Sequence, residues 1–369
     1  FKLEKEAIPR WSKFIQGYYD ATLLVSDVFD QAVEMVSGGE LNLTETMKKR
    51  GVQLTKDVRP TIFYFGFNML DDVVGGYTEE KKKLRQAIAI AIDAEEYIQI
   101  FRNGRDVPAY GPIPPGIFGY QSGKDGINPF IYDWDETRNR PVRKSIAEAK
   151  RLLAEAGYPG GRDKNGKQLV LYFDGRKTGP EAKAEYDWLI KQFAKIGIDL
   201  QIRATDYNRF QDKMLKGNFQ IFEWGWHADY PDPENFLFLF YGPNSKAKFG
   251  GENAANYDNP EFNRLFKQME VMENGPERMQ LIQRLVRIVQ EDCPWICRYF
   301  LVEYLLYHKW FYNTKPLSIG GEMLKYRRID PQLREELRER WNKPIIWPIV
   351  LLTVALVLPG IPAIRTVIK

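Results

Sequence analysis

The sequence reads QLVLYFD at 168–174, AEYDWLIKQFAKIG at 184–197 and IDLQIRAT at 198–205, and these three segments differ in hydrophobic pattern. The first and third alternate between apolar and polar residues, as half-buried β-strands do, whereas the second has the spacing of an amphipathic helix. A strand, a helix and a strand in this order form a βαβ unit, in which the two strands run parallel. The sequence therefore predicts an α/β fold.

The segments on both sides continue this alternation of strands and helices. Residues 1–59 are predicted to be helical, 61–69 to form a strand, and 81–101 to form a single helix that ends at Asn103 and Gly104. A further helix begins after the N-cap Ser145 and stops at Gly157. Downstream, the patterns predict helices at 206–218, 259–272 and 275–292, and strands at 219–226 and 295–308.

The composition of the chain excludes several classes of protein. Its 369 residues suffice for two folded lobes, and its net charge of +4 is small beside 53 basic and 49 acidic residues. A nucleic-acid-binding protein would concentrate positive charge, so we expect no nucleic-acid partner. If Cys293 and Cys297 lie on one strand, their separation of about 13 Å is too large for a disulfide. We predict no metal site and no cofactor.

The stretch EWGWHADYPDPENF at 223–236 raises the question of catalysis, because His227 and Asp229 resemble an acid–base pair. We expect these two side chains to lie on different faces of the chain. No nucleophile–base arrangement, P-loop, HExxH motif or dinucleotide-binding fingerprint accompanies them. The sequence therefore predicts a binding protein, not an enzyme. The stretch follows a predicted strand, and the carboxyl ends of strands are where open α/β sheets bind ligands.

Six segments resemble, in the same order, the extracytoplasmic solute-binding proteins of peptide and nickel ABC importers, known as family 5. They are FYFGFNM (63–69), LRQAIAIAID (84–93), YGPIPPGIFGY (110–120), AEAKRLLAEAGYPGG (147–161), WGWHADYPDPENFL (224–237) and the CPWI strand with its aromatic residues (293–300). The resemblance implies a periplasmic-binding-protein-like fold of type II, in which two lobes close over a ligand by a hinge motion.

The resemblance also implies how the chain is divided. Residues 61–298 correspond to a complete ligand-binding lobe, residues 1–60 to part of the first lobe, and residues 299–335 to the return into that lobe. Residues 336–343 would then form a juxtamembrane linker. Relatives carry most of a first lobe before the point that matches Phe1, so we expect the chain to hold one complete lobe and part of its partner.

Five residues of the stretch at 223–236 are candidate ligand contacts, and the resemblance assigns a role to one of them. In peptide-binding relatives, the acid that corresponds to Asp229 receives the amino terminus of the ligand. Trp224, Trp226 and Tyr230 would form flat apolar walls, and His227 is a further candidate ligand contact. Two alternatives remain open: Asp229 could only cap the turn before the next proline, and His227 could have a structural role.

The segment IIWPIVLLTVALVLPGIPAI at 345–364 is uncharged and apolar. A helix of this length spans about 30 Å, the thickness of the hydrocarbon core of a bilayer. We therefore predict a transmembrane helix at 344–364 that contacts membrane lipid, with a buried core helix as the alternative. The surrounding charges do not decide its orientation.

Together these observations predict a membrane-anchored extracytoplasmic solute-binding component of an ABC importer for peptides. The chain would cross the cytoplasmic (inner) membrane once, with its folded domain on the periplasmic or extracellular side. Its partners would be a peptide-like ligand and an ABC transporter permease or another integral membrane complex. The alternative is a structural accessory subunit of a larger membrane complex that no longer binds solute.

Overall fold

The computed structural model describes residues 4, 6–35, 41–315, 319, 323–344 and 346–357. The chain divides into two compact units, which are described separately below. The smaller unit comprises Phe1–Thr55, Tyr304–Lys315 and Met323–Lys369, and the larger comprises Lys56–Glu303 and Pro316–Glu322. The lobe boundaries inferred from the sequence (1–60, 61–298, 299–335, 336–343 and 344–364) stay a prediction.

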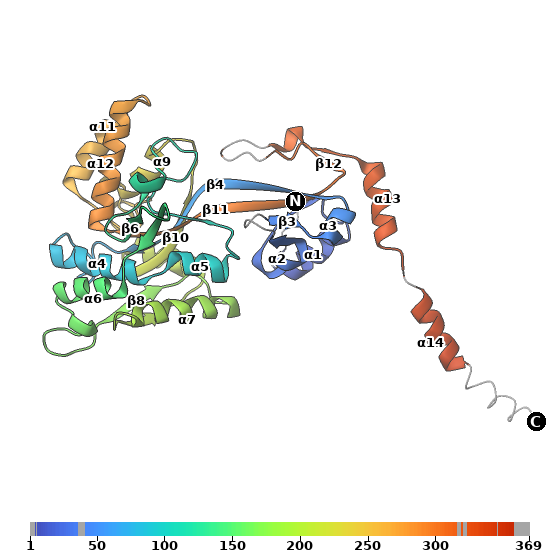
Figure 1. Ribbon diagram of the computed structural model, residues 1–369, viewed down its shortest axis with the longest axis horizontal. Helices are drawn as coiled ribbons and strands as arrows, with labels where there is room; N and C mark the ends of the chain where they lie inside the picture. Colours follow the sequence, from blue (N-terminus) through green and yellow to red (C-terminus); the bar gives the residue numbers. More distant parts are fainter. Residues whose placement is uncertain are drawn as a thin grey trace, which may run out of the picture. The chain divides into compact units, whose positions relative to one another are not determined.

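A mixed β-sheet forms the centre of the larger unit (Figure 1). Its strand order is β1-β11-β4-β10-β8-β9, and β5 pairs with β11. The strands are β1 (Ala21–Leu23), β4 (Val52–Phe67), β5 (Val107–Pro108), β8 (Val170–Asp174), β9 (Asp199–Ile202), β10 (Ile221–His227) and β11 (Trp295–His308). Of these strands, β4 and β11 run on into the smaller unit, to which β1 also belongs.

The predicted βαβ unit is present. Strands β8 and β9 are parallel, with Val170 opposite Asp199, and they are joined by α7 (Pro180–Ala194). Strand β10 is also parallel to β8, with Ile221 opposite Phe173, whereas it pairs antiparallel with β4. The carboxyl ends of three neighbouring strands, β8, β9 and β10, therefore lie at the same edge of the sheet.

Helices cover both faces of this sheet (Figure 1). One layer packs with Phe65 and Phe67 of β4, and it consists of α4 (Glu79–Ala91), α5 (Ala94–Phe101), α6 (Ile146–Glu155) and α7. The other layer packs with Ile62 and Tyr64 of the same strand. It consists of α8 (Tyr207–Leu215), α9 (Glu234–Leu237), α11 (Pro260–Met269) and α12 (Pro276–Asp292). The alternation of β4 thus supplies both cores, as expected for a central strand.

The helix boundaries agree with the sequence in part. Ser145 is the N-cap of α6, and its Oγ accepts the backbone N–H of Glu148 at 3.1 Å. The prediction of one helix at 81–101 is wrong, because the chain breaks between α4 and α5. Asp93 caps α5, and its Oδ1 accepts the backbone N–H of Glu96 at 2.9 Å. An aspartate that can cap a new helix competes with helix continuation.

Shorter elements complete the larger unit. The hairpin of β6 (Tyr132–Asp135) and β7 (Arg140–Arg143) precedes α6. The other short elements are η2 (Gly123–Gly126), η3 (Pro159–Gly161), η4 (Phe238–Phe240), η5 (Gly242–Asn244) and α10 (Lys246–Phe249).

The smaller unit contains helices and short strands, so the prediction that residues 1–59 are helical is wrong in part. The helical elements are α1 (Ala7–Ile15), η1 (Ser26–Val28), α2 (Phe29–Ala32), α3 (Glu45–Lys49), η6 (Met323–Tyr326), α13 (Pro331–Trp341) and α14 (Trp347–Val357). The short strands are β2 (Val33–Met35), β3 (Leu41–Leu43), β12 (Phe311–Tyr312) and β13 (Arg328–Ile329). Strand β1 pairs with the distant β11, with Ala21 opposite Tyr307, a long-range contact that local periodicity does not encode.

A stack of aromatic rings forms the core of the smaller unit. The His308 imidazole lies between Phe14 and Trp310, with ring centres 4.3 Å and 4.2 Å away. Its Nε2 is hydrogen-bonded to the Phe14 carbonyl oxygen at 2.8 Å. Burial lowers the pKa of His308 to about 4, so the ring is neutral at physiological pH.

The predicted transmembrane helix is not found among the described helices. Helix α14 has 11 residues, which corresponds to a length of about 16 Å. Ile345 and residues 358–369, which include the second part of the predicted segment, lie outside the described residues. Within the described part of the chain, no helix is both long and apolar enough to cross a bilayer. Apolar side chains of α14, such as Trp347 and Leu352, are exposed.

Candidate functional site

The site predicted from the sequence lies where β10 ends. The strand stops at His227, and the chain then bends through Asp229 and Tyr230 toward α9. Both of these side chains are exposed, and the Tyr230 hydroxyl donates a hydrogen bond to Glu234. The structure thus places the Asp229 carboxylate in solvent, in the loop that directly follows the strand.

The buried side chain of Asn235 holds the bend at Asp229 in place. Its Oδ1 accepts the backbone N–H of Asp229 at 2.9 Å and the indole N–H of Trp226 at 3.1 Å. The Asn235 side chain is buried, so water does not readily replace its oxygen as the acceptor for these two N–H groups. One amide oxygen therefore fixes both the main chain of Asp229 and the ring of Trp226.

A second anchor ties the loop to α12. Arg278 donates two hydrogen bonds of 2.7 Å to the two carboxylate oxygens of Asp232. Its Nε also donates to the Met269 carbonyl oxygen at 3.1 Å, and the side chain is almost fully buried. A planar, two-bond pair of this kind restricts orientation as well as distance. The loop that carries Asp229 is therefore held rigidly.

The two tryptophans point to the face of the sheet that α8 and α9 cover. Trp224 packs on Phe210 with ring centres 5.2 Å apart, and Trp226 meets Phe238 edge-on at 5.3 Å. Lys246 Nζ lies 5.5 Å from the centre of the Trp224 ring. Both indoles are partly buried, so each offers only part of its surface to a ligand. Much of their role is packing.

His227 has a hydrogen-bond partner within the sheet. Its Nδ1 and the Thr61 hydroxyl lie 2.6 Å apart, across the antiparallel pair of β10 and β4. Burial lowers the pKa of His227, and the charge of Arg59 adds to this, while Glu303 and Asp229 oppose it. The bond to Thr61 agrees with the structural role that the sequence left open as an alternative.

The expectation that His227 and Asp229 lie on different faces is wrong. Two residues separated by one position in an extended chain point to the same face. The structure agrees, since His227 and Asp229 are both exposed whereas Ala228 between them is buried. Within the described residues, no group of three or more His, Cys, Asp or Glu could hold a metal ion.

Glu223 lies on the face of β10 opposite Trp224 and Trp226, and it belongs to a buried ion pair that the sequence did not reveal. Its Oε1 accepts a hydrogen bond from Arg298 Nη1 at 2.9 Å, and the Arg298 guanidinium lies 3.9 Å from the centre of the Tyr97 ring. Burial raises the pKa of Glu223, but attraction to Arg298 and then Lys177 outweighs it, so the pKa falls below its ordinary value. The partners are 75 positions apart in the sequence, which hides them from pattern analysis.

The Asp229 carboxylate differs from these paired acids. Among the described residues it has no ion pair, and the main chain that carries it is fixed. A carboxylate held in this way can accept a charge-assisted hydrogen bond from a cation such as an ammonium group. All five predicted residues lie on β10 or on the loop that follows it. They are Trp224, Trp226, His227, Asp229 and Tyr230.

The larger unit also has a pocket of about 560 Å³, to which none of these five residues contributes. Part of its lining comes from the proline- and glycine-rich loop at 107–120. Neither cysteine lines it. Cys293 is buried and Cys297 is half-buried, both are unpaired, and burial raises the pKa of both thiols, that of Cys293 to about 12.

Comparison with known proteins agrees with the family resemblance found in the sequence. The chain is 29% identical over 250 residues to heme-binding protein A of Haemophilus influenzae, which covers 66% of this chain and 40% of that protein. It is 24% identical over 262 residues to the oligopeptide-binding protein OppA of Bacillus subtilis, which covers 68% of this chain and 44% of that protein. The chain thus spans less than half the length of these two relatives.

Solved structures show the same fold. The periplasmic binding protein DppA from Helicobacter pylori, in complex with the peptide STSA, superposes with a TM-score of 0.68 at 18% identity, over 89% of this chain and 56% of that one. The oligopeptide-binding protein AppA from Bacillus subtilis, in complex with a nonapeptide, gives a TM-score of 0.67 at 18% identity, over 89% and 60%.

The family model described as bacterial extracellular solute-binding proteins, family 5 Middle, matches residues 22–248. This match covers more than half of the chain, and it includes the strand end and loop that carry Asp229. The chain therefore belongs to the bacterial extracellular solute-binding proteins of family 5.

Proposed function

We propose that the chain is the solute-binding component of an ABC importer for peptides, and that Asp229 receives the amino terminus of the peptide. The observation that supports this most directly is the exposed Asp229 carboxylate, which has no ion pair among the described residues. Its main chain is fixed by Asn235, and its loop by Arg278. A preformed carboxylate binds an ammonium group without the entropy cost of ordering a loop.

Relatives support a peptide as the ligand. Proteins named as oligopeptide-binding and dipeptide-binding are similar to this chain, and so is one named as heme-binding. A single exposed carboxylate on a fixed loop suits the ammonium group of a peptide. The family is one of solute-binding proteins, which agrees with binding rather than catalysis.

Calorimetry with di- to pentapeptides tests the proposal, using the protein with both lobes. Each peptide is compared with its N-acetylated form, which has no ammonium group. We expect heat for free peptides only, and we expect Asp229→Asn to weaken their binding by on the order of 2–5 kcal/mol. Asp212→Asn, an exposed acid on α8, is the matched control. Equal binding of acetylated peptides, or unchanged affinity in Asp229→Asn, would sink the proposal.

We also propose that the segment at 345–364 anchors the chain to the cytoplasmic membrane, with the folded part outside. The exposed apolar side chains of α14 support contact with lipid. Flotation with liposomes tests this: the chain should float, and Leu351→Glu with Leu352→Glu should reduce flotation. Wild-type chain that stays at the bottom of the gradient would contradict anchoring.

Native purification tests the partner. Copurification with an ABC permease is the expected result. Stable copurification with a membrane complex that is not a transporter, together with no heat from any peptide, would favour the accessory subunit instead.

A further inference from the structure

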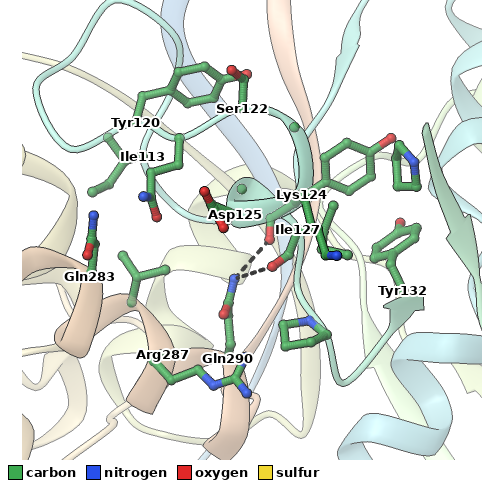
Figure 2. Close-up of a pocket in the computed structure, with 18 of the residues that line it drawn as sticks. Ile113, Tyr120, Ser122, Lys124, Asp125, Ile127, Tyr132, Gln283, Arg287 and Gln290 are labelled. Carbon is green, nitrogen blue, oxygen red and sulfur yellow. Dashed lines mark hydrogen bonds between the residues drawn. The ribbon is translucent and has the colours of Figure 1, made fainter. Parts of the chain in front are cut away.

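The pocket in the larger unit is built from two sides of one lobe (Figure 2). Gln283, Arg287 and Gln290 of α12 lie on one side, and the loop that carries Tyr120, Ser122 and η2 lies on the other. Every lining residue falls within 108–141 or 283–300, so the pocket needs no contribution from the smaller unit. It is separate from the strand end that carries Asp229.

The walls of this pocket are mostly apolar. Tyr132, Ile113 and Phe300 are buried side chains that line it, and Tyr120 meets Phe300 edge-on at 6.2 Å between ring centres. Four prolines, at positions 108, 112, 129 and 141, stiffen the surrounding chain. A volume of about 560 Å³ lies in the range of small-molecule sites, which are typically apolar with a few polar groups.

The charged side chains of the lining fall into two groups. Lys124 pairs with Glu136, and Asp133 pairs with Lys144. In contrast, Asp125 and Arg287 have no ion pair among the described residues, although both line the pocket and carry opposite charges. The Arg287 guanidinium lies 4.8 Å from the centre of the Phe130 ring. Stacking of this kind leaves the edge of the guanidinium available for a carboxylate.

Gln290 supplies a buried polar group at the same place. Its Nε2 donates to the carbonyl oxygens of Tyr110 at 3.3 Å and of Ile127 at 3.5 Å, as the dashed lines in Figure 2 show. These two bonds fix the orientation of the amide. They leave its Oε1 without a hydrogen bond to any described residue. This oxygen can accept a hydrogen bond from a ligand that brings a donor.

We propose that this pocket binds a second, smaller ligand: a zwitterion with an apolar side chain, such as a free aromatic amino acid. Asp125 and Gln290 Oε1 bind its ammonium group, and Arg287 binds its carboxylate. The aromatic and aliphatic walls around Tyr132 enclose its side chain. This site is formed by one lobe alone and does not depend on the peptide site proposed above.

Calorimetric titration of the purified chain with L-phenylalanine tests the proposal. Phenethylamine, which lacks the carboxylate, and 3-phenylpropionate, which lacks the ammonium group, are titrated in parallel. We expect saturable binding of L-phenylalanine and binding at least about tenfold weaker for each analogue. Asp125→Asn should weaken L-phenylalanine and phenethylamine and leave 3-phenylpropionate unchanged. Arg287→Gln should weaken L-phenylalanine and 3-phenylpropionate and leave phenethylamine unchanged.

Three further variants keep the test specific. Arg284→Gln, on α12 but outside the pocket, should leave binding unchanged. Val286→Trp should fill the pocket and abolish binding while the thermal unfolding transition is retained. Asp229→Asn should affect peptides and not L-phenylalanine, so the two proposals fail independently. Absence of saturable L-phenylalanine binding at millimolar concentration, or equal affinity in Asp125→Asn and Arg287→Gln, would overturn the proposal.

Discussion

Arg278 of α12 and Asp232 of the loop after β10 form a two-bond ion pair, with both N–O distances at 2.7 Å. Arg278 is only 3% exposed, whereas the carboxylate of Asp232 reaches the surface. The guanidinium also donates a hydrogen bond to the Met269 carbonyl oxygen, so it links the loop to the last residue of α11. The pair therefore holds the loop in position, and, within the part of the chain that the structure describes, it leaves the exposed carboxylate of Asp229 in the same loop unpaired.

Removing the carboxylate of Asp232 should destabilise the larger unit. In Asp232→Ala the buried guanidinium of Arg278 loses its counter-charge, and we expect the free energy of unfolding to fall by about 2–4 kcal/mol. Urea denaturation followed by tryptophan fluorescence measures this. Asp212→Ala, which breaks the exposed pair of Asp212 and Lys216 at 2.8 Å, should cost less than about 1 kcal/mol. Equal losses in both variants would argue against an anchoring role.

Asn235 should control the order of the bend at Asp229. Asn235→Ala leaves the N–H of Asp229 and the indole of Trp226 without an acceptor, at a cost of about 1–3 kcal/mol for buried groups. We expect faster amide exchange at Asp229 and weaker peptide binding, since the loop must then be ordered on binding. Hydrogen exchange by mass spectrometry checks the first effect. Exchange at wild-type rates would show that Asn235 does not hold the bend.

The ion pair of Glu223 and Arg298 should make the free energy of unfolding depend on pH in the acidic range. Because the pKa of Glu223 in the folded protein lies below its ordinary value, its contribution is complete above about pH 4.3 and is lost as the pH falls through the folded pKa. Glu223→Gln should therefore lower stability at neutral pH and flatten its decline in acid. Denaturation curves at several pH values measure both. A decline as steep as in wild type would assign the acid sensitivity to other carboxylates.

His308 should also make the protein less stable as the pH falls, but over a higher pH range than Glu223. Its pKa falls from about 6.5 unfolded to about 4 folded, so stability is complete above about pH 6.5 and falls as the pH drops toward 4. The loss amounts to about 3 kcal/mol. His308→Phe should abolish this slope and keep the stack with Phe14 and Trp310. If the slope between about pH 6.5 and 4 persists in the variant, His308 is not its source.

The periodic segments were predictable because their pattern is local. The unit at 168–205 became β8, α7 and β9, and Ser145 caps α6 as its position suggested. The strand that ends just before Asp229 also followed from the sequence. These features depend on alternation, capping and strand order, and each acts over a few residues.

Features that depend on distant partners were not predictable. Strand β1 exists because it pairs with residues near Tyr307, and β4 extends to Val52 although its first half is not strongly alternating. The partner of Asp232 is 46 positions away, and that of Glu223 is 75 positions away. A single sequence carries no signal for such pairs, because any acid and any base have the same local pattern.

The raised pKa of both thiols has a practical consequence. Maleimides and disulfide reagents attack the thiolate, and burial keeps Cys293 and Cys297 in the thiol form. The natural chain should thus be nearly silent toward such labels, and no cysteine needs to be removed. A single thiol introduced at exposed Ser122, on the rim of the pocket in Figure 2, could then carry a fluorophore that reports occupancy directly.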